Sequence, residues 1–203
     1  MRILSMHILY KRTEKTIFLK SCYWLDFISF LKRRFVKETL NFGARTTISK
    51  IGKGQIVRVE SEEQKETIIY GHINEQSLGV VVITDTEYPE SAACKIILEL
   101  QNMFLAIYSA DFLKNYTEDQ DMKFPEMEAK IAKYQDPKEA DKLIKIENDL
   151  TEIQTALHKT MEDLFDRGEK LDDLVKKSED ISGTAYSFYK KSKEANQSCC
   201  SLY

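Results

Sequence analysis

The chain has 203 residues, of which 42% are apolar and 31% are charged, and its formal net charge is -3. This length suits one ordinary domain plus an extra element, or two small domains, and the balance of residue types is that of a globular protein. The charge argues against nucleic acid as the main partner, because nucleic-acid-binding domains carry a clear basic excess. No apolar run reaches about eighteen residues, so we expect no membrane-spanning helix.

The cysteines indicate a reducing compartment. Cys22 and Cys94 each stand alone in an apolar segment, where a buried thiol is the expected state. Cys199 and Cys200 are adjacent and cannot staple a core. We therefore expect no disulfide bonds. The first fifteen residues alternate like a strand and lack a small-residue cleavage site, so we also predict no secretory signal.

Residues 1 to 85 are typical of a β-rich region with one inserted helix. Five segments show the alternation and the residue types of strands, with short polar breaks between them: 1–10, 16–25, 55–61, 66–73 and 78–85. The break KRTEK predicts a hairpin between the first two. In the inserted segment, Asp26 is a candidate cap for a helix and Gly43 is a candidate stop signal.

Two further helices are expected after the last predicted strand. One begins near Pro89, and apolar residues from Ala93 to Ile107 recur along it at steps of three and four. A polar stretch follows, and then a short helix over 125–134. Strands with helices segregated on the faces of the sheet predict an α+β fold class.

The pattern changes after Pro137. From Lys138 to Tyr203 there is no proline and no strand-like alternation, and the pattern predicts one long helix. Small or apolar residues recur along it at alternating steps of three and four for more than seven heptads, which indicates a coiled coil. We call these positions the seam: Leu143, Ile146, Leu150, Ile153, Leu157, Thr160, Leu164, Arg167, Leu171, Leu174, Ser178, Ile181, Ala185, Phe188, Ser192 and Ala195.

The seam is unsuited to a two-stranded coil. Ser178, Ala185 and Ser192 would leave gaps there and suit a bundle with more helices. Gly168 and Gly183 each weaken a helix by about 1 kcal/mol relative to alanine. We therefore expect the lone helix to be frayed or disordered and to fold when it meets its partners.

Arg167 interrupts the seam with a charge. A buried guanidinium is unfavourable unless acceptors meet its donors, and a polar seam residue can fix the register and the number of helices. Alternatively, the helix rotates slightly and Arg167 extends to solvent. The periodicity leaves both interpretations open.

The segment LFDRGEKLDDLVKKSE, together with the following FYKK, resembles the motif of R-SNAREs, the vesicle-fusion proteins named for an arginine at their central layer. The resemblance implies that Arg167 meets three glutamines, one from each of three Q-SNARE helices (Qa, Qb and Qc), in a parallel four-helix bundle. The position of Arg167 between Leu164 and Leu171 agrees with the family pattern.

The first half resembles a longin domain in its order of strands and helices and in the turn ITDTEYPESAA. The join YQDPKEAD and the ending NQSCC are similar to the lipid-anchored, Ykt-type members of the R-SNAREs. The resemblance implies a profilin-like longin domain with a five-stranded antiparallel sheet over 1–124, a linker with a short helix over 125–137, the coiled-coil motif over 138–198 and a lipidation tail over 199–203.

The resemblance also implies a closed soluble form, in which the SNARE segment folds back on the longin domain and a groove of that domain shelters the prenyl group. Phe42 stands where the family has an apolar residue important for this closure. Ordinary core packing is the alternative for Phe42.

The ending CCSLY reads as a lipidation signal. Cys200 lies four residues from the end, as in a prenylation box, and Cys199 can carry a palmitoyl chain. Free thiols are the alternative, and Ser201 and Tyr203 depart from the usual box, which leaves the prenyl type open. Two lipid chains are needed for stable anchoring, and three lysines within 190–193 add attraction to anionic headgroups.

The resemblance implies a protein that cycles between the cytosol and the cytoplasmic face of membranes and drives fusion there, in ER/Golgi, endosomal, vacuolar or autophagosomal traffic. A longin-type adaptor or tether with a static coiled coil is the alternative. His7, His72 and His158 lack metal-ligand spacing, and IGKGQ at 51–55 lacks the phosphate-loop pattern. We therefore expect no enzyme activity, no small-molecule substrate and no cofactor other than covalent lipids.

Overall fold

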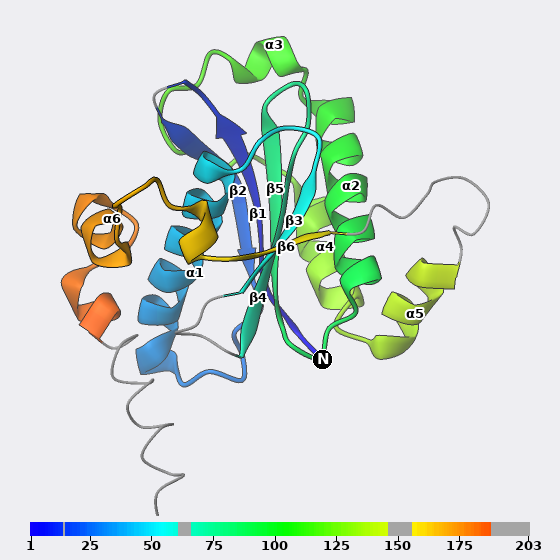
Figure 1. Cartoon of the computed structure of the whole chain (residues 1–203). Helices are drawn as coiled ribbons and strands as arrows, with labels where there is room; N and C mark the ends of the chain where they lie inside the picture. Colours follow the sequence, from blue (N-terminus) through cyan, green and yellow to red (C-terminus); the bar gives the residue numbers. More distant parts are fainter. Residues whose placement is uncertain (14, 61–65, 146–155, 188–203) are drawn as a thin grey trace, which may run out of the picture.

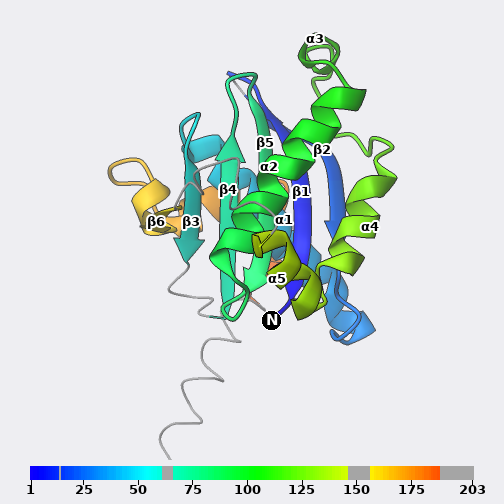
Figure 2. The ribbon, with the colours of Figure 1, turned by 90° about the vertical axis from the view of Figure 1, so that its right-hand side faces the viewer.

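The structure is a computed structural model of the whole chain, and it describes residues 1–13, 15–60, 66–145 and 156–187. A central sheet separates two layers of helices (Figures 1 and 2). Five antiparallel strands form most of it: β1 (Ile3–Lys11), β2 (Thr16–Tyr23), β3 (Ile56–Glu60), β4 (Thr67–Ile73) and β5 (Leu78–Asp85). A sixth strand, β6 (Leu157–Thr160), pairs in parallel with β3 and gives the order β2-β1-β5-β4-β3-β6.

The five antiparallel strands lie where alternation and turn residues predict them, so the predicted α+β class is confirmed. The central strands β1 and β5 are buried along nearly their whole length, because helices cover both faces of the sheet. The predicted hairpin joins β1 to β2, with Tyr10 opposite Ile17.

One face of the sheet carries α2 (Glu90–Ile107), α4 (Pro125–Lys133) and α5 (Pro137–Lys145), and the short helix α3 (Ala110–Leu113) lies beyond the ends of the strands, after α2 (Figure 2). The helix α2 starts directly after Pro89, as predicted. The predicted short helix is α4, and its Met127 and Ile131 are buried in the same apolar cluster as α2. The stretch predicted as a linker is therefore packed against β1 and β2.

The other face is covered by α1 (Phe30–Lys50), and the predicted stop at Gly43 is wrong. A Cβ on Gly43 would lie 2.9 Å from Cδ1 of Ile69, and one on Gly79 of β5 would lie 2.9 Å from Cγ2 of Ile48. These glycines, one on α1 and one on the sheet, let α1 lie close to the strands. Gly43 therefore serves packing rather than termination.

The start of α1 also differs from the prediction. Ser29, not Asp26, precedes the first helical residue, and its side chain forms no capping hydrogen bond. Asp26 lies in the preceding loop, where its carboxylate is 3.4 Å from the guanidinium of Arg33. The prediction placed the cap three residues too early.

The single long helix predicted over 138–198 is wrong for the described part of this segment. After α5 the chain forms β6, a 3-10 turn η1 (Glu162–Leu164), the short helix α6 (Leu171–Lys177) and a helical stretch over 183–187. Gly168 adopts a φ of 87°, a left-handed conformation that breaks the helix between η1 and α6. A lone helix could not bury its apolar stripe, and short pieces can follow the surface of the sheet domain instead.

The described helices include none with the length and apolar character needed to cross a bilayer. Cys22 and Cys94 are free thiols, and burial raises the pKa of Cys94 to about 12. Both sit in or beside the apolar cluster on the α2 face, as expected for structural thiols.

Candidate functional site

The candidate site is the contact between two parts of the chain. The sheet domain comprises residues 1–133, and the C-terminal segment comprises residues 156–187. The C-terminal segment runs along the edge of the sheet and then over the outer side of α1, so that α1 lies between the sheet and α6 (Figure 1).

The contact begins with backbone pairing at the sheet edge. The parallel register places Val57 of β3 opposite Leu157 of β6, and the N–H of Met161 then donates to the carbonyl of Glu60 at 2.8 Å. An edge strand has unpaired backbone groups that can recruit another strand. In this structure, β6 occupies that edge. We call this arrangement, in which the C-terminal segment packs on the sheet domain, the closed chain.

Side chains around His158 strengthen this pairing. Arg58 donates to Nδ1 of His158 at 3.1 Å, which leaves Nε2 to donate to the carboxylate of Glu90 at 3.2 Å. Glu90 also accepts from the backbone N–H of Ala156 at 3.3 Å. This imidazole therefore joins the segment to the start of α2.

Beyond the edge, apolar side chains of the segment enter the groove beside α1. Met161 and Leu164 are buried in the cluster that contains Leu40, Ile69 and Ile83, and Phe165 packs partly against it. These contacts extend the core between α1 and the sheet.

A second apolar contact centres on Phe42. This α1 side chain is buried together with Val175, Ile181 and Ala185 of the segment. Ala185 is fully buried in this contact. Leu171, among other half-buried residues, lies at the margin. Phe42 therefore faces the returning segment rather than the interior of the sheet domain.

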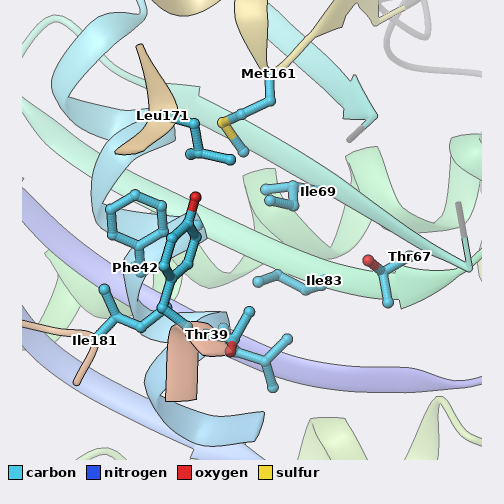
Figure 3. A pocket seen from close by; sticks show the side chains of 11 residues that line it. Thr39, Phe42, Thr67, Ile69, Ile83, Met161, Leu171 and Ile181 are labelled. Atoms are coloured by element: carbon cyan, nitrogen blue, oxygen red, sulfur yellow. The ribbon is translucent and has the colours of Figure 1, made fainter. Parts of the chain in front are cut away.

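A small cavity of about 30 Å³ remains between these two contacts (Figure 3). Its volume is comparable to that of one water molecule. Met161, Leu171 and Ile69 point toward it in Figure 3. Its lining comprises Thr39, Leu40, Phe42, Gly43, Thr67, Ile69, Ile83, Met161, Leu171, Ile181 and Tyr186.

Arg45 of α1 forms the main polar link. Its Nε lies 2.6 Å from Oδ2 of Asp180, and its Nη2 lies 2.8 Å from Oδ1 of the same carboxylate and 2.6 Å from Oδ2 of Asp119. The guanidinium also lies 4.4 Å from the ring centre of Phe18. Burial acts to lower the pKa of Arg45, but the hydrogen bonds to Asp119 and Asp180 outweigh it and raise the pKa. Arg45 thus stays charged while it holds the segment.

Two further polar contacts flank this link. At the end of α1, Nζ of Lys50 lies 2.6 Å from carboxylate oxygens of both Asp166 and Glu169. These hydrogen bonds raise the pKa of Lys50, and the bond from Lys50 lowers the pKa of Glu169. Nearer the start of α1, the hydroxyl of Ser182 donates to Glu38 at 2.6 Å.

The described seam residues are divided between different environments. The buried ones are Leu164, Ile181 and Ala185. The half-buried ones are Leu143, Thr160, Leu171, Leu174 and Ser178. Leu157 is exposed, and so is Arg167, which lies in the loop between η1 and α6 and forms no ion pair with any described residue. The remaining predicted positions lie outside the described residues: Ile146, Leu150, Ile153, Phe188, Ser192, Ala195, Cys199 and Cys200.

Sequence reasoning missed part of this interface. Met161, Phe165 and Val175 are apolar but off the seam, and they pack on the α1 face of the sheet domain. Their presence beside an already complete seam was a signal of a second packing surface. The Arg45–Asp180 pair gave no local signal, because its members are far apart in the sequence and Arg45 lies beyond the predicted end of the helix.

The other histidines have structural surroundings. His7 is fully buried between the hydroxyls of Ser5 and Ser21, and burial lowers its pKa to about 3. His72 is hydrogen-bonded to Gln101 at 2.7 Å. Within the described ranges, no three His, Cys, Asp or Glu side chains form a group that could hold a metal ion.

Comparisons with known proteins match both parts of this arrangement. The longin profile, described as a regulated-SNARE-like domain, matches residues 28–131, and the synaptobrevin profile matches residues 142–201. Synaptobrevin homolog YKT6 of Saccharomyces cerevisiae is 35% identical over 203 residues, which cover 98% of each chain. The chain belongs to the longin-domain synaptobrevin family.

Two further relatives support the same assignment. The proteins named synaptobrevin homolog YKT6 from Eremothecium gossypii and Candida glabrata are 35% and 36% identical. The first match covers 98% of each chain, and the second covers 92% of this chain and 90% of its relative. This longin-domain synaptobrevin is therefore an R-SNARE of vesicle traffic, and its family is not one of enzymes.

Proposed function

We propose that this R-SNARE switches between the closed chain and an open form that pairs with three Q-SNARE helices to fuse membranes. The observation that carries the proposal is the burial of three seam residues, Leu164, Ile181 and Ala185, against the sheet domain. The same side chains cannot pack there and in a helical bundle at the same time. Closure and assembly would therefore compete for one set of residues.

Arg167 is proposed as the central layer of the bundle. In the closed chain it is exposed between two pieces of the segment that bind the sheet domain. In the bundle, three glutamine side chains, one from each of the Qa, Qb and Qc helices, would accept its hydrogen bonds. The planar fork of arginine suits several acceptors at once.

Membrane attachment is proposed to rest on covalent lipids, a prenyl group on Cys200 and a palmitoyl group on Cys199. One chain alone gives marginal and reversible attachment, whereas two anchor stably. The groove beside Phe42 is apolar and suits a prenyl chain chemically, but its remaining cavity of about 30 Å³ is far too small for one. Sheltering a prenyl chain would therefore require Met161 or Leu171 to move.

The sites of action are proposed to be Golgi, endosomal, vacuolar or autophagosomal membranes, with a second population of the closed form in the cytosol. The seam ends at Ala195, four residues before Cys199, and we propose that assembly runs from Leu143 toward Ala195. Assembly in that direction would pull the lipidated end, and its membrane, toward the membrane of the partners.

A lipid-mixing experiment tests the fusion proposal. Vesicles carrying the lipidated protein are mixed with vesicles carrying the three cognate Q-SNAREs, and dequenching of a lipid dye is followed. We expect mixing, and an increased rate for Phe42→Ala because the segment is released. Absence of mixing with a lipidated and folded protein would contradict the proposal.

The partners that co-purify distinguish this function from a tether. Three different glutamine-bearing helices are expected with the R-SNARE. Self-association without them would favour the adaptor alternative. The intact mass of the protein from its own cells tests the two lipids separately.

A further inference from the structure

The beginning of α1 carries three exposed apolar side chains. Phe30 and Leu31 are 82% and 80% exposed, and Phe27 in the preceding loop is 44% exposed. Phe30 and Leu31 are the most exposed large apolar side chains among the residues that the structure describes. They contribute little to the core, so packing of the sheet domain does not explain them.

Basic residues follow these apolar side chains directly. Lys32, Arg34 and Lys37 are exposed on the same half of α1. Arg33 is partly buried, and it donates to the carbonyls of Asp26 and Ile28 in the loop before the helix. The acidic residues of this stretch, Asp26 and Glu38, are fewer than the basic ones. The stretch is therefore locally basic in a chain of net charge -3.

We propose that this surface, formed by Phe27, Phe30, Leu31, Lys32, Arg34 and Lys37, binds the interface of an anionic membrane. Exposed aromatic and aliphatic side chains next to Lys and Arg are the composition of segments that lie in the headgroup region. The apolar side chains enter the acyl boundary, and the basic ones attract anionic headgroups. The charge complementarity favours a membrane over a second copy of this chain, which would bring like charges together.

The position of the surface agrees with this role. The last described part of the C-terminal segment packs beside the same half of α1, where Ser182 bonds to Glu38 and Phe35 adjoins the cluster of Ile181 and Ala185. Figure 1 shows this part of the segment next to the end of α1 that carries the surface. Residues 188–198 alone separate it from Cys199 and Cys200. The nearness of the surface to a membrane anchor rests on the proposed lipidation of Cys199 and Cys200.

The test uses the full chain without lipids, as Cys199→Ser/Cys200→Ser, so that it does not depend on the anchor. Flotation measures its partition onto phosphatidylcholine vesicles with and without about 30 mol% phosphatidylserine. We expect binding only to the anionic vesicles, and weaker binding as salt increases. Phe30→Ser/Leu31→Ser should lower the partition coefficient roughly tenfold or more, and Arg34→Glu/Lys37→Glu should lower it similarly.

A matched control is Ile107→Ser/Phe112→Ser, which removes two exposed apolar side chains near the opposite end of the molecule. This control should bind like the parent protein. Thermal unfolding of each variant checks that the fold is kept, as the exposure of Phe30 and Leu31 predicts. Equal binding by the Phe30→Ser/Leu31→Ser variant and its parent would overturn the proposal, and so would absence of binding by the parent. Self-association of the parent that this variant abolishes would instead assign the surface to a second copy.

Discussion

The sheet domain and the C-terminal segment use the same kinds of residue in opposite ways. In the sheet domain, Ile97, Leu100 and Phe104 are fully buried in a single apolar cluster. In the segment, apolar residues are buried in short pieces that a left-handed glycine and loops interrupt, and ion pairs from α1 hold the pieces. The comparison teaches that an apolar repeat can be more regular than the observed structure requires. Such a repeat predicts a second structure, which forms on assembly with other helices.

The largest expected effect falls on the sheet domain. Phe104 is fully buried and packs edge-on against Phe124, with ring centres 5.3 Å apart. Phe104→Ala should lower the free energy of unfolding by about 3–5 kcal/mol because it leaves a cavity. Urea unfolding followed by circular dichroism measures this. The half-exposed Phe112→Ala is the control, with an expected loss of about 1 kcal/mol or less.

A smaller and more local effect is expected at the boundary of the two regions. Phe42→Ala should weaken closure by about 3 kcal/mol, since the ring packs on Val175, Ile181 and Ala185. Hydrogen exchange should increase over 171–187 and stay nearly unchanged over 96–104. An equal increase in both ranges would mean that Phe42 supports the sheet domain rather than closure.

The polar link should contribute less than Phe42. A double-mutant cycle with Arg45→Met and Asp180→Leu should give a coupling free energy of about 1–2 kcal/mol in the closing equilibrium. Asp119→Asn is a matched comparison, because Asp119 also bonds to Arg45 but belongs to the sheet domain. It should lower the stability of the domain and leave exchange in the segment less affected. Coupling near zero would reduce the Arg45–Asp180 pair to an incidental contact.

The smallest expected effect is a dependence on pH. Hydrogen bonds from Lys50 lower the pKa of Glu169 below its usual 4.5. A lowered pKa means that the contact stabilises the closed form above about pH 4.5 and is lost as the pH falls through the lowered value. Amide chemical shifts of 166–187 should therefore report opening in acid. Lys50→Met should reduce that dependence, and an unchanged profile would exclude this pair as its cause.

Much of the sheet domain could be predicted because its signals are local. Alternation, polar breaks and Pro89 located five strands and the start of α2. The end of α1 was missed because Gly43 is read locally as a stop, whereas its reason is the approach of Ile69 on a strand distant in sequence. A single sequence does not show that tertiary neighbour.

The segment shows what the pattern of apolar residues can and cannot predict. The residues around Arg167 correctly indicated the synaptobrevin family. The heptads did not predict the structure of the described part of the segment. That structure depends on a groove made by other parts of the chain and on charges such as Arg45, which follow no period. The role of Phe42 in closure and the layer at Arg167 stay predictions, as do both lipid sites.

The exposure of Arg167 in the closed chain has a consequence for partner choice. In the closed chain the guanidinium of Arg167 is exposed and keeps its hydration shell, so closure does not desolvate this charge. In the proposed bundle, this guanidinium would lose its water only when other helices surround it. A helix without carbonyl oxygens at that level would then leave the buried charge unpaired, which is unfavourable. If Arg167 forms the proposed central layer, its exposure in the closed form would let it contact candidate partner helices while Leu164, Ile181 and Ala185 are still buried against the sheet domain.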